Sequence, residues 1–218
     1  MKQIVLFSLS VLLFINCNNR AKKPTESSSR TELVPEPDKA ERLKQEALQA
    51  LAKSGCVLTD PDTSLGGIMI RNPESTIAVI GEKDKPDSMD QYHYYSAFDR
   101  EVLTLTQHAG DGQYTISIFA VTYADKADYS YRRLKTDTFK TGKGIQLGIS
   151  KKQITEKLGA CYAALDSTKD YIELYYQLAA PADSKTSLLA THNMPVYYAS
   201  YKLRQDKLIQ FEFGFEYP

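Results

Sequence analysis

Hydrophobic and polar residues alternate most clearly near the C-terminal end of the chain. Five apolar residues fall on one face of a predicted strand there: Ile209, Phe211, Phe213, Phe215 and Tyr217. The other face carries Gln210, Glu212 and Glu216, which is typical of an antiparallel strand that is buried on one side only. The turn RQDK (204–207) connects this strand to a preceding one, predicted over residues 196–203.

The same alternation occurs in the middle of the chain. Strands are predicted over residues 102–106 and 114–123, on either side of the glycine-containing turn HAGDG (108–112). A further strand is predicted before each pair, over residues 92–98 and 171–176, because apolar and aromatic residues again occupy every second position. The chain therefore contains two predicted three-stranded antiparallel meanders.

One longer pattern occurs twice, as GGIMIRNPESTIAVIGEK from residue 66 and as GIQLGISKKQITEKLGAC from residue 144, 78 positions later. In both copies an apolar lead-in precedes a residue that suits a helix N-cap, Asn72 in the first copy and Ser150 in the second. Each predicted helix ends at a glycine, Gly81 or Gly159, which tolerates the backbone angles of a helix C-terminus. The repeat therefore predicts a short helix ahead of each meander.

An additional helix is predicted over residues 38–53, where apolar residues follow the spacing of three and four that places them on one helix face. Asp38 suits its N-cap, and Gly55 favours a stop. Together the elements predict an α+β fold of two tandem two-layer units, each a short helix packed on a small antiparallel sheet, plus the N-terminal helix. The expected bounds are 38–135 for the N-terminal helix with the first repeat and 136–218 for the second repeat.

The pattern GIQLGIS, followed by a short helix that ends in LG and by strands with alternating aromatic residues, resembles the SmpA/OmlA-type lipoproteins. These are accessory proteins of outer-membrane assembly. They share an architecture with the β-lactamase-inhibitory protein, which is a tandem repeat of such units. The resemblance covers residues 136–218 well and residues 57–125 loosely. It implies this fold and, by analogy, a function through protein–protein contact.

The N-terminal segment predicts export and lipid anchoring. A lysine precedes the apolar run IVLFSLSVLLFI (4–15), which is shorter than the roughly 20 residues that span a bilayer and is typical of a signal-peptide core. Cys17 follows this core and resembles the lipidated cysteine of bacterial lipoproteins. We expect residues 1–16 to be the signal peptide and residues 17–37 to be the lipidated cysteine and a flexible linker. Secretion without a lipid is the alternative.

Composition and charge narrow the class of protein. Lys and Arg together number 27, as do Asp and Glu, so the net charge is 0 and no basic surface for nucleic acid is expected. Tyrosine is abundant, with 15 copies, and tryptophan is absent, which suits half-buried strands. With a lipid on Cys17, the expected location is the cell envelope, and the resemblance to the SmpA/OmlA-type lipoproteins implies the outer membrane.

The sequence motifs predict no catalysis, metal or cofactor. The histidines His93, His108 and His192 are too far apart in the sequence to form a ligand pair. Asp60 and Asp62 lack the further oxygen ligands of a calcium loop and favour a turn. The glycines match no phosphate-binding motif, and no nucleophile motif is present, so we expect no enzyme activity.

Cys56 and Cys161 remain once Cys17 carries a lipid. In an oxidising compartment they could form a disulfide that closes a loop of about 105 residues and stabilises the fold by a few kcal/mol. The alternative is two separately buried thiols, which behave as small hydrophobic side chains. The sequence leaves both open.

Two regions are candidates for contact with a partner. Residues 179–195 form an insertion that the first meander lacks, and it contains Leu188, Leu189 and His192. The two leucines either contact a partner or fold back onto the sheet. The second candidate is an aromatic surface formed by three tyrosines of the predicted strands: Tyr92, Tyr175 and Tyr197.

The sequence thus favours a lipid-anchored envelope protein that binds another envelope or secreted protein, as an assembly accessory or an inhibitor. The alternative is an envelope enzyme or a small-ligand binder that uses a cleft between the two repeats. An exposed aromatic surface would support the first function, and a deep pocket with converging polar groups would support the second.

Overall fold

The computed structural model describes four stretches of the chain, residues 39–125, 131–165, 170–179 and 188–217. The predicted signal peptide, Cys17 and the predicted linker lie outside the described residues, as does part of the insertion. The described helices are α1 (Lys39–Lys53), α2 (Pro73–Ile80), α3 (Lys151–Leu158) and α4 (Leu188–His192). The described strands are β1 (Ser64–Leu65), β2 (Ile68–Met69), β3 (Gln91–Tyr95), β4 (Glu101–Gln107), β5 (Ile116–Tyr123), β6 (Arg132–Arg133), β7 (Ala163–Leu165), β8 (Tyr171–Ala179), β9 (Val196–Arg204) and β10 (Lys207–Phe215).

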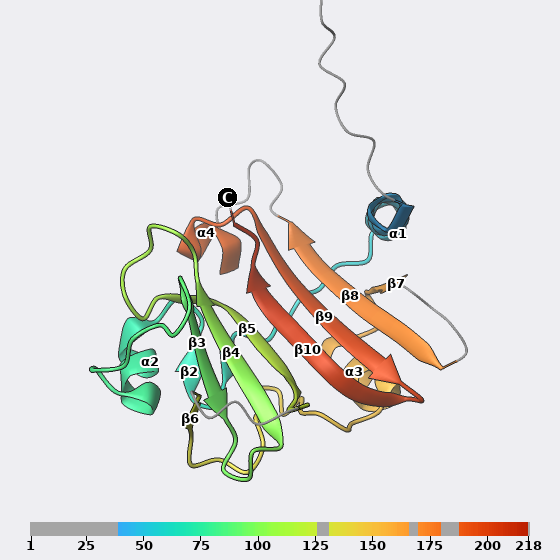
Figure 1. The fold of residues 1–218 in the computed structure, drawn as a ribbon. Coiled ribbons are helices and arrows are strands. Elements are labelled where there is room, and N and C mark those ends of the chain that lie inside the picture. Colours follow the sequence, from blue (N-terminus) through green and yellow to red (C-terminus); the bar gives the residue numbers. More distant parts are fainter. Residues whose placement is uncertain (1–38, 126–130, 166–169, 180–187, 218) are drawn as a thin grey trace, which may run out of the picture. The chain divides into compact units, whose positions relative to one another are not determined.

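Eight of these strands form one mixed sheet, in the order β6-β3-β4-β5-β10-β9-β8-β7 (Figure 1). Neighbouring strands are antiparallel except β6, which runs parallel to β3. The two predicted meanders are present as β3-β4-β5 and β8-β9-β10, and their strand ends lie within about three residues of the predicted ones. β1 and β2 form a separate two-stranded hairpin.

The predicted arrangement in two units, each with its own small sheet, is wrong. The last strand of the first meander, β5, pairs with the last strand of the second, β10, from Ile118↔Gly214 to Thr122↔Gln210. The physical reason is that each meander alone would leave a row of unpaired N–H and C=O groups on its last strand. Pairing the two edges satisfies these groups and merges both meanders into one large sheet.

Gly214 allows the two central strands to approach each other closely. A Cβ atom at this position would lie 2.2 Å from the carbonyl oxygen of Ser117 and 2.7 Å from the Cα atom of Ile118. Any larger residue would therefore push β10 away from β5. The glycine that interrupts the aromatic run of the last strand is thus required where the two meanders join.

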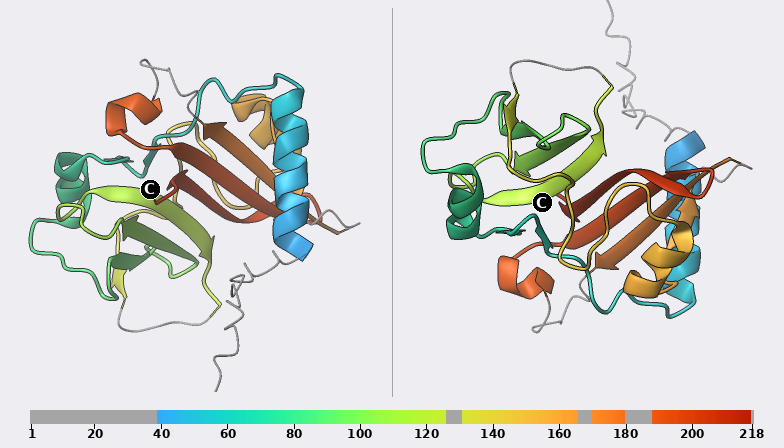
Figure 2. Two further views of the ribbon diagram at one scale, coloured as in Figure 1. Left: turned by 90° about the horizontal axis from the view of Figure 1, so that it is seen from above. Right: turned by 90° about the horizontal axis from the view of Figure 1, so that it is seen from below.

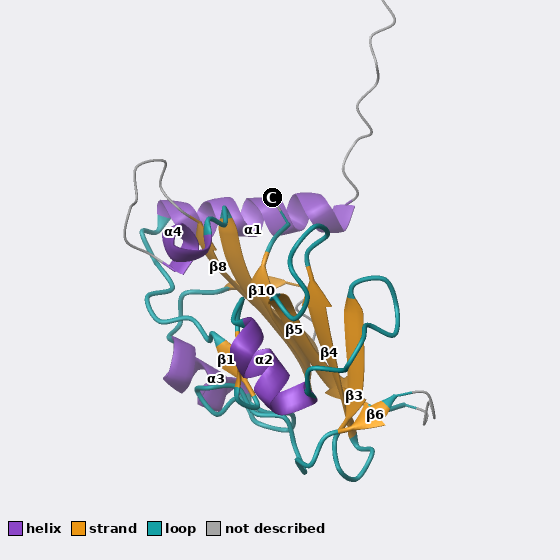
Figure 3. Ribbon diagram, turned by 90° about the vertical axis from the view of Figure 1, so that its left-hand side faces the viewer, coloured by secondary structure: helices purple, strands orange, loops and turns teal. Residues whose placement is uncertain are grey.

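The two faces of the sheet differ in the elements that pack against them. On one face, which we call the closed face, alternate side chains of the six meander strands are buried in a single core. Its largest side chains include Tyr92, Tyr94, Phe119, Tyr176, Tyr197, Tyr201, Phe211 and Phe213. Helices α2 and α3 and the β1–β2 hairpin pack against this core (Figures 2 and 3). We call the opposite face, formed by the other alternate side chains, the open face.

Both short helices begin and end where the sequence predicts them. The side chain of Asn72 accepts a hydrogen bond from the first turn of α2 at 2.9 Å, and Ser150 forms a capping box with Gln153 at the start of α3. Each helix ends at a glycine with positive φ, Gly81 or Gly159. The two helices lie on the same face of one sheet, however, and not on separate sheets.

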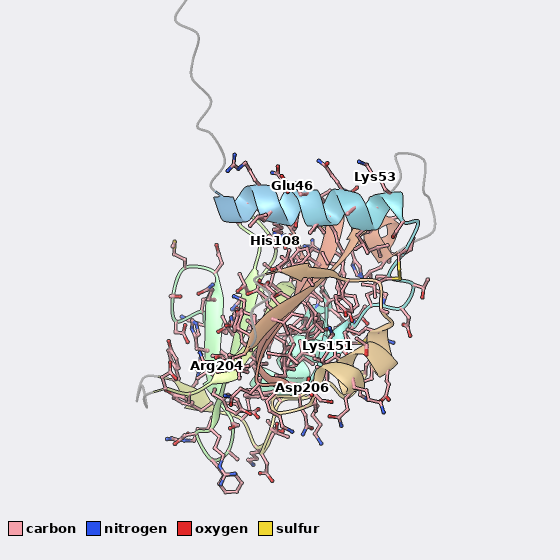
Figure 4. All side chains as sticks on the ribbon, turned by 90° about the vertical axis from the view of Figure 1, so that its right-hand side faces the viewer. Glu46, Lys53, His108, Lys151, Arg204 and Asp206 are labelled. Carbon is pink, nitrogen blue, oxygen red and sulfur yellow. A yellow bond between two sulfur atoms is a disulfide. The ribbon has the colours of Figure 1, made fainter. Side chains whose placement is uncertain are left out.

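Helix α1 lies on the open face, at the edge formed by β7 and β8 (Figures 2 and 4). The segment after α1 contains Cys56, whose sulfur is bonded to that of Cys161, with a Cα–Cα distance of 5.4 Å. Of the two alternatives that the sequence left open, the structure has the disulfide. Because Cys161 follows α3, the bridge joins a segment next to the open-face helix to one next to a closed-face helix.

Candidate functional site

Polar side chains of the open face line a cavity of about 360 Å³ between α1 and strands β8, β9 and β10. We call this cavity the open-face pocket. Six of its residues form hydrogen-bonded pairs: Glu173, Tyr175, Tyr198, Ser200, Glu212 and Glu216. They occupy alternate positions on neighbouring strands, so the pleat of the sheet directs their side chains to the same side. Lys44 of α1 completes the wall of the pocket.

Each glutamate of the open-face pocket accepts a hydrogen bond from a hydroxyl group. The three pairs are Tyr175 to Glu216 at 3.2 Å, Ser200 to Glu173 at 2.5 Å, and Tyr198 to Glu212. All three hydroxyls donate to the Oε1 atom of the carboxylate. Among the residues that the structure describes, the Oε2 atoms have no hydrogen-bond or ion-pair partner. The pocket therefore presents three oriented carboxylates, each with one oxygen left for a ligand.

The two tyrosines of the pocket are neutral hydrogen-bond donors with stacked rings. Burial, followed by the charge of Glu216, raises the pKa of Tyr175 far above its ordinary value. Burial and then Glu212 do the same to the pKa of Tyr198. The ring centroids lie 6.1 Å apart, and the Nζ atom of Lys44 lies 4.4 Å from the centre of the Tyr175 ring. That distance is within the range of a cation–π interaction.

The three tyrosines that we predicted from the sequence to form one partner surface lie on two different faces of the sheet. Tyr175 lines the open-face pocket, with 4% of its surface exposed. Tyr92 and Tyr197 lie on the closed face with 0% of their surface exposed. Their hydroxyls donate inside the protein, to the side chain of Gln107 at 2.8 Å and to the backbone oxygen of Asp62 at 2.7 Å. In this fold they are core residues, and a partner cannot reach them.

Strand register decides which tyrosines share a face, and it identifies residues that the sequence analysis missed. Tyr175 pairs with Ser200, so Ser200 and Tyr198 of β9 point to the open face while Tyr197 points to the closed face. Glu212 pairs with Ser200 and so joins them. The polar side of the last strand was visible in the sequence. The strand that would supply its neighbours was not, because that depends on register.

The described end of the insertion packs on the protein's own core. Leu189 in α4 is buried, with 1% of its surface exposed, and Leu188 packs beside it. The His192 ring lies 5.4 Å from the Phe215 ring. Burial, with a smaller effect from the charge of Arg71, lowers the pKa of His192. Of the two alternatives for these leucines, the structure therefore favours folding back onto the sheet.

A second polar cluster connects the start of α2 to β5. Arg71 donates to both carboxylate oxygens of Asp111, at 2.7 and 3.0 Å, and to the hydroxyl of Ser117 at 2.8 Å. His108 lies nearby, with its Nε2 atom 3.0 Å from the backbone oxygen of Phe215. Burial lowers the pKa of His108. These contacts hold the ends of elements together, and we assign them a structural role.

Asp62 accepts a hydrogen bond that holds the loop around Lys143 in place beside the closed face. Its Oδ1 atom accepts the backbone N–H of Lys143 at 2.9 Å, while Asp60 pairs with the ammonium group of the same lysine. Burial raises the pKa of Asp62, and a hydrogen bond from Thr141 acts in the opposite direction. In the described part of the chain, its Oδ2 atom is buried without a hydrogen-bond partner.

A separate apolar cavity of about 530 Å³ lies between α2 and the segment 133–139. Leu65, Val79 and Leu103 contribute to its walls, as do Arg133 and Lys135. It is not a cleft between the two meanders, because β5 and β10 are hydrogen-bonded neighbours. It is distinct from the open-face pocket in both position and polarity.

Comparison with family models, with curated proteins and with solved structures found no match for this chain. Its functional assignment therefore depends on its own sequence and geometry. Within the described residues, no helix combines the length and the apolar character that crossing a membrane requires. The same residues contain no cluster of three or more His, Cys, Asp or Glu side chains that could hold a metal ion.

Proposed function

We propose that this chain is a lipid-anchored protein of the cell envelope whose open face binds another protein, as an assembly accessory or an inhibitor, without catalysis. The observation that supports this proposal is the open-face pocket, a half-open hollow on the sheet rather than a deep enclosed pocket, where tyrosines and carboxylates of neighbouring strands point to one side. Tyrosine is favoured in protein interfaces because it combines a large contact area with a hydrogen-bonding group. Its hydroxyls here are already oriented, so a partner would lose little free energy in ordering them.

A photo-crosslinking amino acid at position 210 tests the binding surface. Gln210 lines the open-face pocket, and its side chain is not one of the groups that orient the glutamates. The matched control is position 152 in α3, where 84% of the lysine side chain is exposed. We expect a discrete adduct with one envelope or secreted protein from position 210 and none from position 152. No adduct from position 210, or equal adducts from both, would contradict the proposal.

Lipidation of Cys17 is the second part of the proposal, and it would anchor the protein in a membrane of the cell envelope, which the family resemblance suggests is the outer membrane. Several acyl chains at about 0.8 kcal/mol per buried CH₂ would make this anchoring effectively permanent. Metabolic labelling with palmitate tests it directly. The native chain should incorporate label, and the Cys17→Ala variant should not. Equal labelling of the variant would exclude this cysteine as the lipid attachment site.

The apolar cavity beside α2 favours small-ligand binding as a second candidate function. Its volume of about 530 Å³ is in the range of ligand pockets, and its walls are mostly apolar. A fluorescent fatty-acid analogue should then bind saturably to the native chain. Val79→Arg, which places a charge in the cavity wall, should abolish that binding. A signal that rises without saturation, or one that the substitution leaves unchanged, would reject this candidate.

A further inference from the structure

We infer that the open-face pocket receives an arginine side chain of a partner protein, and that Lys44 of α1 occupies the same position in the free protein. This inference rests on the proposed function, because it names the chemical group that the partner would place on the open face. Three observations carry it: the charge of the pocket, the stacked tyrosines, and the position of the Lys44 ammonium group.

The charge of the pocket favours a cation. Glu173, Glu212 and Glu216 contribute three carboxylates. In the described part of the chain, the lysines that line the pocket are Lys44 and Lys202. Lys202 is the cross-strand neighbour of Glu173, so these two residues balance each other within the sheet. Glu212 and Glu216 are left as the pair of carboxylates that an incoming cation would meet.

The hydrogen bonds prepare these two carboxylates for a group with several donors. Tyr175 and Tyr198 donate to the Oε1 atoms of Glu216 and Glu212, which leaves the Oε2 atoms without a partner among the described residues. A guanidinium group carries five N–H donors in a planar fork, whereas an ammonium group is a compact point charge. An arginine can therefore form a bidentate pair with either of these carboxylates, and bonds of this charge-assisted kind are the stronger ones.

The stacked rings favour arginine over lysine for a second reason. Tyr175 and Tyr198 are nearly parallel, with an interplanar angle of 11° and centroids 6.1 Å apart. Tyr175 is only 4% exposed and lies beneath Lys44, so a cation from a partner reaches its ring where the Lys44 side chain has moved away. A flat, weakly hydrated guanidinium can then stack on this surface while its edge bonds to a carboxylate. The pocket thus offers a flat aromatic wall and two carboxylates, which match the two recognition features of an arginine side chain.

Lys44 shows that the site accommodates a cation. Its Nζ atom lies over the Tyr175 ring at 4.4 Å from the centre, and it comes from a helix on the open face. Other charged residues of α1, such as Glu46 and Lys53, point away from the strands (Figure 4). Lys44 is therefore an internal cation placed to compete with the arginine of a partner. Its removal should strengthen binding of an external cation.

Titration of the purified full-length protein with a hexa-arginine peptide at low ionic strength tests the inference, with affinity measured by calorimetry. Lys44→Gln should bind the peptide about threefold more tightly than the native chain, because the competing cation is gone. The double variant Glu212→Gln/Glu216→Gln should bind about tenfold more weakly. The matched control is Glu74→Gln/Glu156→Gln, which removes the same charge from exposed positions of α2 and α3. Its affinity should equal that of the native chain.

Two further peptides define the group that is recognised. Hexa-citrulline has nearly the same shape as hexa-arginine without the charge, and it should not bind measurably. Hexa-lysine should bind more weakly than hexa-arginine. The inference is overturned if hexa-lysine binds as tightly as hexa-arginine, or if the open-face double variant and its control lose the same affinity. Thermal unfolding of each variant shows whether the fold is retained.

The inference and the proposed function can fail separately. If the adduct from position 210 forms equally well in the native chain and in Glu212→Gln/Glu216→Gln, the open face binds a protein without using an arginine. That result overturns the inference and leaves the proposed function standing. If position 210 gives no adduct while hexa-arginine binds as expected, the pocket recognises guanidinium and the proposed function is the part that fails.

Discussion

The closed and open faces of the sheet use tyrosine in opposite ways. Tyr197 and Tyr201 on the closed face are fully buried in the core, and within the described residues the Tyr201 hydroxyl has no hydrogen-bond partner. Tyr175 and Tyr198 on the open face donate to glutamates that line a pocket. Burial raises the pKa of all four. The same side chain therefore serves packing on one face and a candidate binding site on the other.

The elements that pack on each face explain why tyrosine has a different role on each. α2 and α3 exclude water from the closed face, so its tyrosines contribute mainly buried apolar area. On the open face α1 packs near β7 and β8, and polar groups line the half-open pocket beside it, although Tyr175 and Ser200 are themselves largely buried. Substitutions on the closed face should therefore change stability, whereas substitutions on the open face should change binding.

The largest expected effect is that of Phe213→Ala on the closed face. Phe213 is completely buried and stacks on Phe119 across the seam between β5 and β10, with centroids 5.0 Å apart. Removing the ring should reduce the free energy of unfolding by about 4 kcal/mol. Tyr198→Ala on the half-buried open face should cost about 1 kcal/mol. Urea unfolding measures the free energy of unfolding of both variants. Equal losses would contradict the claim that the closed face contributes more to stability than the open face.

The disulfide connects elements of the two faces, and its loss should have the next largest effect. Cys56→Ser/Cys161→Ser should reduce the free energy of unfolding by about 3 kcal/mol, because the bridge restricts the unfolded chain over a loop of 105 residues. Thermal unfolding of the native chain with and without a reductant gives an independent measurement. A reduced native chain as stable as the oxidised one would show that the bridge contributes nothing.

Asp62 should make stability depend on pH through the closed face. Its pKa is raised above 3.8 in the folded chain, so the folded state binds the proton more tightly than the unfolded state. Its contribution to stability is therefore complete below pH 3.8 and is lost as the pH rises through the folded value. Asp62→Asn removes the ionisable carboxyl and therefore the loss of stability that its ionisation causes. The variant should be about 1 kcal/mol more stable than the native chain at pH 7.

Unfolding of this variant and of the native chain between pH 4 and pH 8 tests the assignment. The difference in stability should grow with pH. Parallel curves for the two proteins would show that the Asp62 carboxyl has the same pKa in the folded and unfolded states.

The smallest expected effects distinguish two tyrosines of the closed face. Tyr197→Phe removes a hydrogen bond to the backbone of Asp62 and should cost about 1 kcal/mol. Tyr201→Phe removes a buried hydroxyl that has no partner in the described part of the chain, so it should stabilise by about 0.5 kcal/mol. Chemical unfolding compares the two. A loss for Tyr201→Phe as large as that for Tyr197→Phe would reveal a bound water at the Tyr201 hydroxyl.

Local elements were predictable because short-range interactions form them. Asn72 and Ser150 cap the helices that follow them, and glycines end those helices, as the sequence indicated. Phe211, Phe213 and Phe215 of the last strand lie in the core as expected. Ile209 and Tyr217 do not: an irregularity between Leu208 and Gln210 puts Leu208 in the core instead, and Tyr217 is 63% exposed beyond the end of β10. Each feature that was predicted correctly depends on residues a few positions apart.

The candidate site was only partly predictable. Tyr175 was selected from the sequence together with Tyr92 and Tyr197, and these lie on opposite faces. An alternating strand has two faces, and its sequence alone does not say which positions of a neighbouring strand join each face. That requires the register, such as the pairing of Tyr175 with Ser200.

The sequence by itself determined helices α1, α2 and α3, the two meanders and most of the apolar side of the last strand, since capping and alternation act over short distances. Helix α4, in the insertion, was not predicted. Only the tertiary structure decided that β5 pairs with β10, that both short helices cover one face, and that α1 lies on the other. The reason is that edge pairing and helix packing join residues about 100 positions apart, such as Ile118 and Gly214, through backbone groups that every residue carries.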